Sequence, residues 1–212
     1  MFGNHLKEVR NLMEIYRYQG KTLHCRRSVA EHSWFVSKVA HGLATWEKYK
    51  FGNEDVDVEK VMFLAINHDI VESYTGDIIS TTKTLSETFR KGLTMVEQAV
   101  FEDKILTTLP KSWGDDYMMV HDEMLELESV DAKIVKSGDL IDRVFECMDE
   151  IKMGNKEPFE EIIRLDLRRL YEMNLMSVNY FLKYSLKDIN AESYLPSEIK
   201  VYLDNIDFSA YF

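Results

Sequence analysis

Apolar residues recur at helical spacing along most of this chain, and this periodicity constrains its fold more than any other feature. The 212 residues include only nine glycines and three prolines. No sustained alternation of apolar and polar residues is bounded by turn signals, so strands are not expected. The length is enough for one well-buried core and does not require two domains. The sequence therefore predicts an all-α chain that forms a single compact multi-helix domain over residues 1–212.

Capping and breaking residues predict where the helices begin and end. Ser28 and Ser129 can cap long helices that run to about residues 50 and 152. Asp57 can cap a helix over 58–74, and Gly76 would end it. Further helices are expected at about 4–18 and 85–108, within 112–128, from Pro158 onward, and in short pieces after residue 174. The first of these is expected to bury Leu6, Val9, Leu12, Met13 and Tyr16.

The formal net charge of -11 argues against a nucleic-acid polymer as partner, because phosphate backbones need clustered Lys and Arg. A small phosphorylated substrate is still compatible with this charge, since a bound metal can reverse the local field. The two cysteines have no metal-ligand spacing, and no stretch has the length of a membrane span. We expect a cytoplasmic protein without a membrane partner.

Four ligand-type side chains are expected on the inner faces of three helices. His32 interrupts an apolar stripe, the pair His68-Asp69 follows an apolar run, and Asp139 lies near the buried edge of a long helix. A core histidine and a buried ion pair are the alternatives at these positions. Two imidazoles and two carboxylates suit Mn²⁺, Co²⁺, Fe²⁺ or Zn²⁺. The joint pattern favours one divalent metal ion.

The dipeptide His-Asp occurs a second time, at His121-Asp122. Its neighbours are acidic, with Asp115, Asp116 and Glu123 close in sequence. We expect a solvated acidic face here and no metal ligand.

The order His32, His68-Asp69, Asp139 resembles the H...HD...D signature of the HD-domain phosphohydrolase superfamily. The strings Glu31-His32-Ser33, His68-Asp69-x-x-Glu72 and Thr75-Gly76-Asp77 are most similar to its bacterial 5'-deoxyribonucleotidase branch. The resemblance covers about residues 5–180, with the last helices appended to this core. It implies an enzyme that removes the 5'-phosphate from deoxynucleoside 5'-monophosphates and holds its metal with His32, His68, Asp69 and Asp139.

The same resemblance implies roles for five further residues. Glu72 would orient water or move a proton to the leaving 5'-oxygen. Arg17 and Tyr18 would contact the phosphate and the sugar. Asp77 would accept a hydrogen bond from the sugar or the base, and Lys83 would contact the phosphate. Three positions depart from the branch's pattern: Tyr18 stands where Trp is expected, and Ile79 and Thr81 replace the prolines of TGDxPxPxK.

Two other functions use the same residues. One is a deoxynucleoside triphosphate triphosphohydrolase on the same metal site. The other is a non-catalytic adaptor or nucleotide-binding module whose metal only stabilises the fold. All three functions imply a small nucleotide as the partner, and the exposed length of the terminal helices is compatible with a homodimer.

Overall fold

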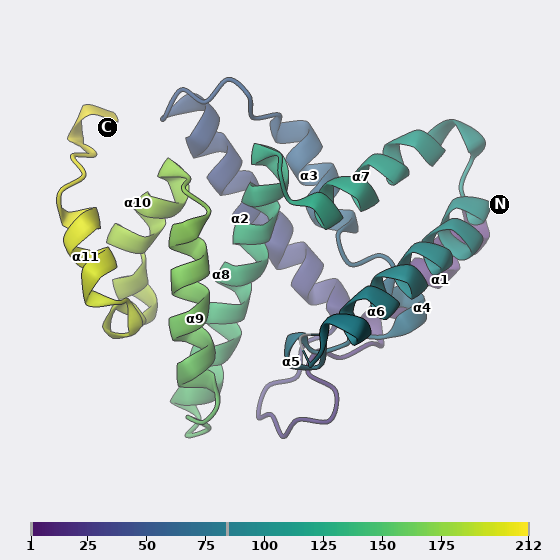
Figure 1. Cartoon of the computed structure of the whole chain (residues 1–212), viewed down its shortest axis with the longest axis horizontal. Coiled ribbons are helices and arrows are strands. Elements are labelled where there is room, and N and C mark those ends of the chain that lie inside the picture. Colours follow the sequence, from purple (N-terminus) through teal and green to yellow (C-terminus); the bar gives the residue numbers. More distant parts are fainter. Residues whose placement is uncertain (1, 84, 212) are drawn as a thin grey trace. The chain divides into compact units, whose positions relative to one another are not determined.

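The computed structural model describes residues 2–83 and 85–211, and the side chains of residues 80 and 81 are not described. In these ranges the chain is helical, and its sole strand-type contact is an isolated bridge between Tyr16 and Ser28 (Figure 1). The predicted all-α class is confirmed. No helix in the described ranges has both the length and the hydropathy that a membrane crossing requires.

The helices have the following bounds: α1 Phe2–Val9, α2 Val29–Tyr49, α3 Val58–Asn67, α4 Glu72–Thr75, α5 Ser80–Lys83, α6 Glu87–Val100, α7 Gly114–Glu126, α8 Val130–Lys152, α9 Phe159–Glu172, α10 Met176–Tyr184 and α11 Ser197–Asp204. Shorter 3-10 or π turns lie at Arg10–Met13, Phe101–Ile105, Leu106–Thr108, Lys111–Trp113, Leu186–Ile189, Glu192–Tyr194 and Ser209–Tyr211.

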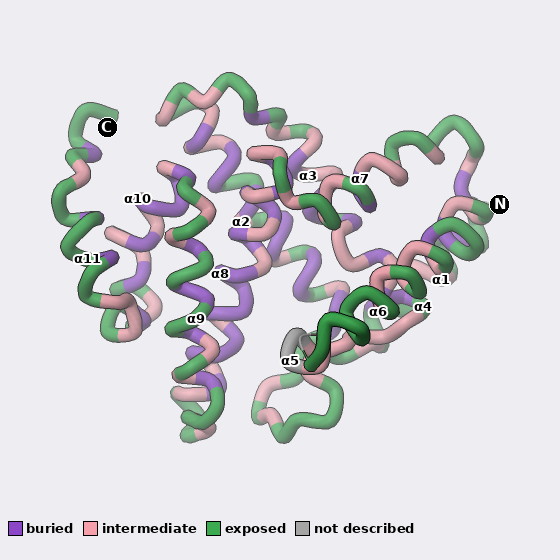
Figure 2. The backbone as a smooth tube through the Cα atoms, viewed as in Figure 1, coloured by how far each residue is buried: buried purple, intermediate pink, exposed green. Residues whose placement is uncertain are grey.

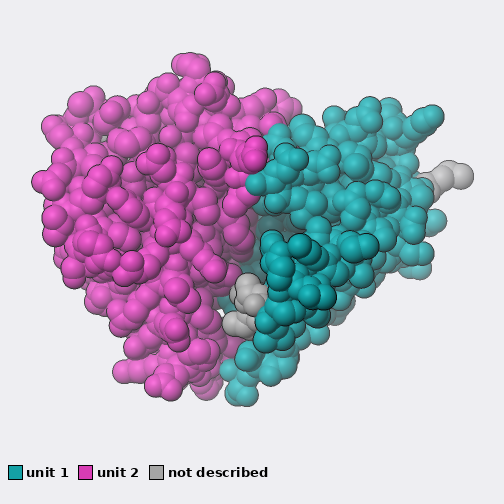
Figure 3. Space-filling view, in the orientation of Figure 1, with its two compact units in different colours: residues 1–22, 26–33, 67–126 teal, residues 23–25, 34–66, 127–212 magenta. Residues whose placement is uncertain are grey.

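The chain divides into two compact units (Figure 3). The first contains residues 1–22, 26–33 and 67–126, and the second contains residues 23–25, 34–66 and 127–212. The prediction of one domain over the whole chain stays a prediction.

The core of the second unit is built around α8, which packs along α9. Residues such as Ile134, Ile141 and Leu167 are fully buried in this unit. Arg143 on α8 donates two hydrogen bonds to the Asp166 carboxylate on α9, at 2.5 and 2.6 Å, so this buried charge is paired. Figure 2 shows the buried positions recurring along both helices.

Gly138 lets α8 approach α2 closely within the second unit. A Cβ atom at this position would lie 3.1 Å from the Val36 carbonyl oxygen and 3.5 Å from the Ala40 Cβ. Both contacts are with a packed helix, so this glycine is required by the close approach and not by a turn.

The first unit has a smaller core, which Ile70, Phe101, Ile105 and Leu109 form. No residue of α6 is fully buried, and much of this helix is exposed in Figure 2. Its N-terminus is capped, because the Ser86 hydroxyl accepts a hydrogen bond from the Phe89 backbone N–H in the first turn.

The helix predicted over residues 4–18 is shorter than expected, and the prediction of which of its residues are buried is wrong. The α-helix ends at Val9, and Leu6, Met13 and Tyr16 are exposed. His5 is buried instead, its ring nitrogen 3.2 Å from the Thr108 hydroxyl. The inward-facing positions are therefore His5, Val9 and Leu12, and the half-buried Val9 packs against the core of the first unit.

The helix predicted over 58–74 is interrupted after Asn67. Backbone bonds of the i to i−3 type follow, from Ile70 to Asn67 and from Glu72 to Asp69, before α4 begins. Ile70 enters the core of the first unit, and the Ser73 hydroxyl donates to the Ile70 carbonyl oxygen. Tertiary packing of Ile70 thus overrides the local helical preference.

Candidate functional site

The position of His32 is set by the start of α2. The Ser28 hydroxyl accepts a hydrogen bond from the Glu31 backbone at 3.2 Å, and the Glu31 carboxylate accepts one from the Ser28 backbone at 2.7 Å. This reciprocal capping box satisfies two amides that would otherwise lack partners. The Ser28 backbone N–H and its hydroxyl both donate to the Glu31 carboxylate, and these two hydrogen bonds lower the pKa of Glu31. His32 follows directly, inside the first turn, and is only 1% exposed.

His68 and Asp69 lie in the turn between α3 and α4, and they converge on His32. The His68 and His32 Nε2 atoms are 3.3 Å apart. The Asp69 Oδ2 atom is 3.2 Å from His68 Nε2 and 3.4 Å from His32 Nε2. Three residues that the sequence predicted to be metal ligands thus place one ligand atom each at the corners of a small triangle.

The triangle has the size that a divalent ion needs. The point equidistant from its corners lies about 1.9 Å from each atom, and a small displacement from the plane gives the roughly 2.0–2.2 Å of metal–ligand bonds. Burial disfavours the charged form of Asp69, but the imidazoles of His68 and His32 hold its pKa well below its usual range. Asp69 is therefore an ionised carboxylate, which is its metal-binding form.

Asp139 lies on α8 in the second unit. Its carboxylate is 2.5 Å from the Lys136 Nζ atom one turn earlier on the same helix. The role of Asp139 as a fourth ligand stays a prediction.

Glu72 is the first residue of α4, and its carboxyl group is buried. One oxygen, Oε2, has no hydrogen-bond partner, and the other, Oε1, is 3.8 Å from the Lys83 Nζ atom. Burial raises the pKa of Glu72 well above its usual value, and the charges of Asp69 and Asp77 act in the same direction. Lys83 and Arg17 oppose this rise. A carboxyl group that holds its proton at higher pH suits proton transfer at neutral pH.

Asp77 fixes the segment that carries Arg17 and Tyr18. The Tyr18 backbone N–H donates a 2.7 Å hydrogen bond to the Asp77 carboxylate, and Tyr18 has a positive φ of 55°. The Arg17 guanidinium lies 5.5 Å from the centroid of the Tyr18 ring, which is a cation–π distance. Asp77 thus has a structural role, while its predicted contact with the substrate stays a prediction, as do those of Arg17 and Tyr18.

Glu97 is a neighbour of this site that sequence reasoning missed. Its Oε1 atom is 3.7 Å from the Lys83 Nζ atom, so Lys83 is paired with carboxylates from two helices. Burial raises the pKa of Glu97, against the effect of Lys83, while the charge of Asp69 adds to the rise. No motif marks Glu97, which is one of two acidic residues on an amphipathic helix.

The prediction of a solvated face at His121 is wrong. This side chain is buried in the first unit, where its ring stacks on Phe101 with centroids 4.5 Å apart and hydrogen-bonds to Gln98. The acidic residues near His121 in sequence suggested an exposed face. They lie on other sides of α7, where residues such as Asp115, Asp116 and Asp122 are exposed. Among the described residues the metal-ligand cluster consists of His32, His68 and Asp69.

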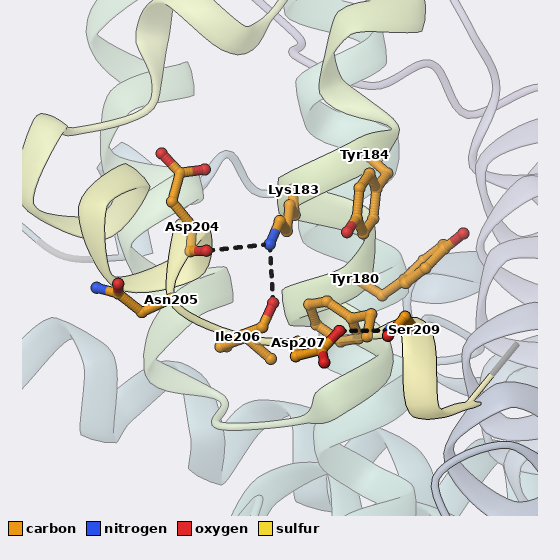
Figure 4. Close-up of a pocket in the computed structure, with 9 residues that line it drawn as sticks. Tyr180, Lys183, Tyr184, Asp204, Asn205, Ile206, Asp207 and Ser209 are labelled. Atoms are coloured by element: carbon orange, nitrogen blue, oxygen red, sulfur yellow. Dashed lines mark hydrogen bonds between the residues drawn. The ribbon is translucent and has the colours of Figure 1, made fainter.

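A pocket of about 450 Å³ lies within the second unit, between α10 and the segment that follows α11 (Figure 4). The Lys183 ammonium donates to the Ile206 carbonyl oxygen at 2.8 Å and to that of Asp204 at 3.5 Å. The Asp207 carboxylate accepts a hydrogen bond from the Ser209 backbone. These hydrogen bonds fasten the segment after α11 to α10 and stabilise its turn. None of the residues that make them is a predicted site residue.

Known proteins resemble this chain over most of its length. Residues 4–189 match the family of YfbR-like 5'-deoxynucleotidases. A 5'-deoxynucleotidase of Vibrio vulnificus is 34% identical over 157 residues, which are 73% of this chain and 78% of the relative. A 5'-deoxynucleotidase of Photorhabdus laumondii is 30% identical over 156 residues, 74% and 77% of the two chains.

Solved structures agree with this likeness. An HD-domain phosphohydrolase of Listeria innocua has a TM-score of 0.79 and 28% identity, covering 95% of this chain and 97% of its own. An HD phosphohydrolase of cyanophage S-2L, bound to dA and one catalytic Zn²⁺ ion, has a TM-score of 0.53 and 14% identity over 94% and 96% of the chains. At that identity the second structure supports the fold alone.

The fold and the His-Asp cluster define this chain as an HD-domain phosphohydrolase. Because the family match spans most of its length, the chain belongs to the family of YfbR-like 5'-deoxynucleotidases. The resemblance inferred from the sequence motifs is thereby confirmed.

Proposed function

We propose that this protein is a metal-dependent 5'-deoxyribonucleotidase, which hydrolyses deoxynucleoside 5'-monophosphates to deoxynucleosides and phosphate. The observation that carries this proposal is the convergence of His32, His68 and Asp69 in a chain of this family. The relatives from Vibrio vulnificus and Photorhabdus laumondii bear the name of this activity.

His32, His68 and Asp69, with Asp139 as the predicted fourth ligand, would hold one divalent ion. Such an ion lowers the pKa of water and so supplies a nucleophile near neutral pH. The donor set is compatible with Co²⁺, Mn²⁺, Zn²⁺ or Fe²⁺. Zn²⁺ has a precedent in the cyanophage enzyme of the same fold.

The chain's own cations neutralise the substrate's phosphate. Lys83 and Arg17 carry charge at the site, since both act on the pKa of the buried Glu72 carboxyl. Charge-assisted hydrogen bonds from these groups to phosphate oxygens would strengthen as charge develops in the transition state.

Glu72 is the group that would move the proton. Its raised pKa and its unpartnered Oε2 atom suit a carboxyl that protonates the leaving 5'-oxygen of the deoxynucleoside. Asp77 keeps Arg17 and Tyr18 in place through the Tyr18 backbone, which would support contacts with the phosphate and the sugar.

Product analysis tests the proposal against its alternatives. We expect orthophosphate from dAMP in the presence of a divalent ion, and no tripolyphosphate from dATP. Tripolyphosphate release would support the triphosphohydrolase instead. Nucleotide binding that raises the melting temperature without any turnover would support the non-catalytic module.

A further inference from the structure

Lys83, at the end of α5, lies near two carboxylates from different helices. Its Nζ atom is 3.8 Å from Glu72 Oε1 on α4 and 3.7 Å from Glu97 Oε1 on α6. The side chains of Glu72 and Glu97 are 9% and 23% exposed, and that of Lys83 is 36% exposed. Water therefore screens these pairs less than it screens the pairs that Glu87 makes with Arg90 and Lys91 on α6, where every side chain is more than 60% exposed.

The two pairs of Lys83 are nearly equal in length, and neither is a close hydrogen bond. An ammonium group has three N–H donors, so two carboxylates leave donor capacity for a phosphate oxygen. The flexible four-carbon stem of lysine would otherwise let the ammonium move toward whichever carboxylate attracts it more. The ammonium lies between α4 and α6, at similar distances from the two carboxyl groups.

The other charges of the site make the intermediate position of the Lys83 ammonium important. Burial lowers the pKa of Lys83, but the charges of the surrounding carboxylates outweigh it and raise the pKa above its usual value; these carboxylates are Glu72, Glu97, Asp69 and Asp77. A substrate phosphate must compete with these carboxylates for the ammonium. A full ion pair between Lys83 and Glu72 would occupy the cation and also keep Glu72 ionised, which disfavours proton transfer by this residue.

We propose that Glu97 is a positioning residue for Lys83: its carboxylate keeps the ammonium from a full ion pair with Glu72 and available to the substrate's phosphate. This inference rests on the proposed phosphatase function. Glu97 itself touches neither the substrate nor the metal and acts through Lys83.

The substitution Glu97→Gln tests this role because it keeps the size of the side chain and removes its charge. We expect kcat/KM for dAMP to fall about three- to tenfold, as is typical when one of two contacting charged groups is removed. The KM should rise. A general electrostatic effect would have the opposite sign, since removing a negative charge near the site should improve the binding of an anionic substrate. Glu97→Asp keeps the charge and should recover part of the loss.

Two further variants show whether Glu97 acts through Lys83. Lys83→Met should lower kcat/KM by itself, and adding Glu97→Gln in that background should cause no further loss. Glu87→Gln is the matched control, because Glu87 lies on the same helix and pairs only with Arg90 and Lys91 in the ion pairs described. Its kinetic constants should stay within about twofold of the wild type, in line with the small contribution of exposed ion pairs.

A calorimetric titration of the metal-loaded chain with inorganic phosphate tests the role of Glu97 independently of the proposed function. Weaker phosphate binding by Glu97→Gln, and not by Glu87→Gln, is expected even if dAMP is not the substrate. A wild type that binds phosphate but hydrolyses no deoxynucleotide would refute the function alone. An unchanged or lower KM with unchanged phosphate binding in Glu97→Gln, or a further loss in the Lys83→Met background, would overturn the role of Glu97.

Discussion

The Glu72 carboxyl is buried beside Asp69 and Asp77, and this surrounding disfavours its ionised form. Its pKa is therefore raised in the folded chain above the ordinary value of 4.5. At pH values between the ordinary pKa and the raised pKa of the folded chain, the folded state binds more protons than the unfolded state. The free energy of unfolding therefore falls as the pH rises through this range. The contribution of Glu72 to stability is fully present below pH 4.5 and is lost as the pH passes the folded pKa.

The metal-free Glu72→Gln variant should consequently be more stable than the wild type at pH 7. The gain is expected to be on the order of 1 kcal/mol in the free energy of unfolding, a common size for a substitution at a buried polar site. Urea unfolding in the presence of a chelator measures it. The difference should disappear near pH 4, where both states of the wild type hold the proton. Lower stability of the variant at pH 7 would show that the Glu72 carboxylate is favourably paired.

The same variant should lose activity although it gains stability. An amide cannot transfer the proton, so kcat should fall by about 10²-fold or more, with a much smaller change in KM. Steady-state kinetics with dAMP provide this measurement, and a wild-type kcat would remove Glu72 from the mechanism.

At the scale of the elements, the helix starts and stops could be predicted because they depend on local chemistry. Ser28 caps α2 and Ser129 caps α8, each by accepting a hydrogen bond from the backbone three residues later. Gly76 follows α4 with a φ of 73° and a ψ of 167°, a backbone conformation that glycine adopts more readily than other residues. Each of these features needs only a few consecutive residues, so the sequence contains the whole signal.

The break after Asn67 could not be predicted in this way. The apolar spacing of Val61, Leu64 and Ala65 continues to His68 without a local stop signal, and only the packing of Ile70 reveals the change. The convergence of His32, His68 and Asp69 could nevertheless be predicted, because motif spacing and ligand chemistry point to these residues whatever the exact helix geometry. Glu97 was missed for the opposite reason, since its partner Lys83 is brought near by folding.

Close packing at Gly138 makes a prediction about α8. Gly138→Ala should destabilise the protein by about 1–3 kcal/mol, because the added methyl group meets a backbone oxygen of α2 that cannot move freely. Alanine's better helix propensity offsets roughly 1 kcal/mol of this cost at most. Gly42→Ala in α2 is the control, since its Cβ meets nothing within 4 Å and should stabilise by about 0.5–1 kcal/mol. Equal effects of the two substitutions in urea unfolding would contradict this account.

For the whole molecule, the ligand set predicts how metal binding depends on Asp139. Asp139→Asn removes a charged oxygen donor and should weaken the binding of a divalent ion by about tenfold or more. Competition with a chelator, monitored with Co²⁺ or Zn²⁺, gives the affinity. Asp142→Asn, one turn further along α8, is a control for changes to this helix. Unchanged affinity in Asp139→Asn would remove this residue from the ligand set.

The most direct test of the proposed function is phosphate release from dAMP by the wild type and by His68→Ala and Asp69→Ala, each supplied with Mn²⁺, Co²⁺, Zn²⁺ or Mg²⁺. Circular dichroism establishes that the variants are folded. We expect metal-dependent release of orthophosphate by the wild type and its loss in both variants, because each variant lacks one corner of the ligand triangle. Full phosphate release by both folded variants, or none by the metal-loaded wild type, would contradict a 5'-deoxyribonucleotidase built on this site.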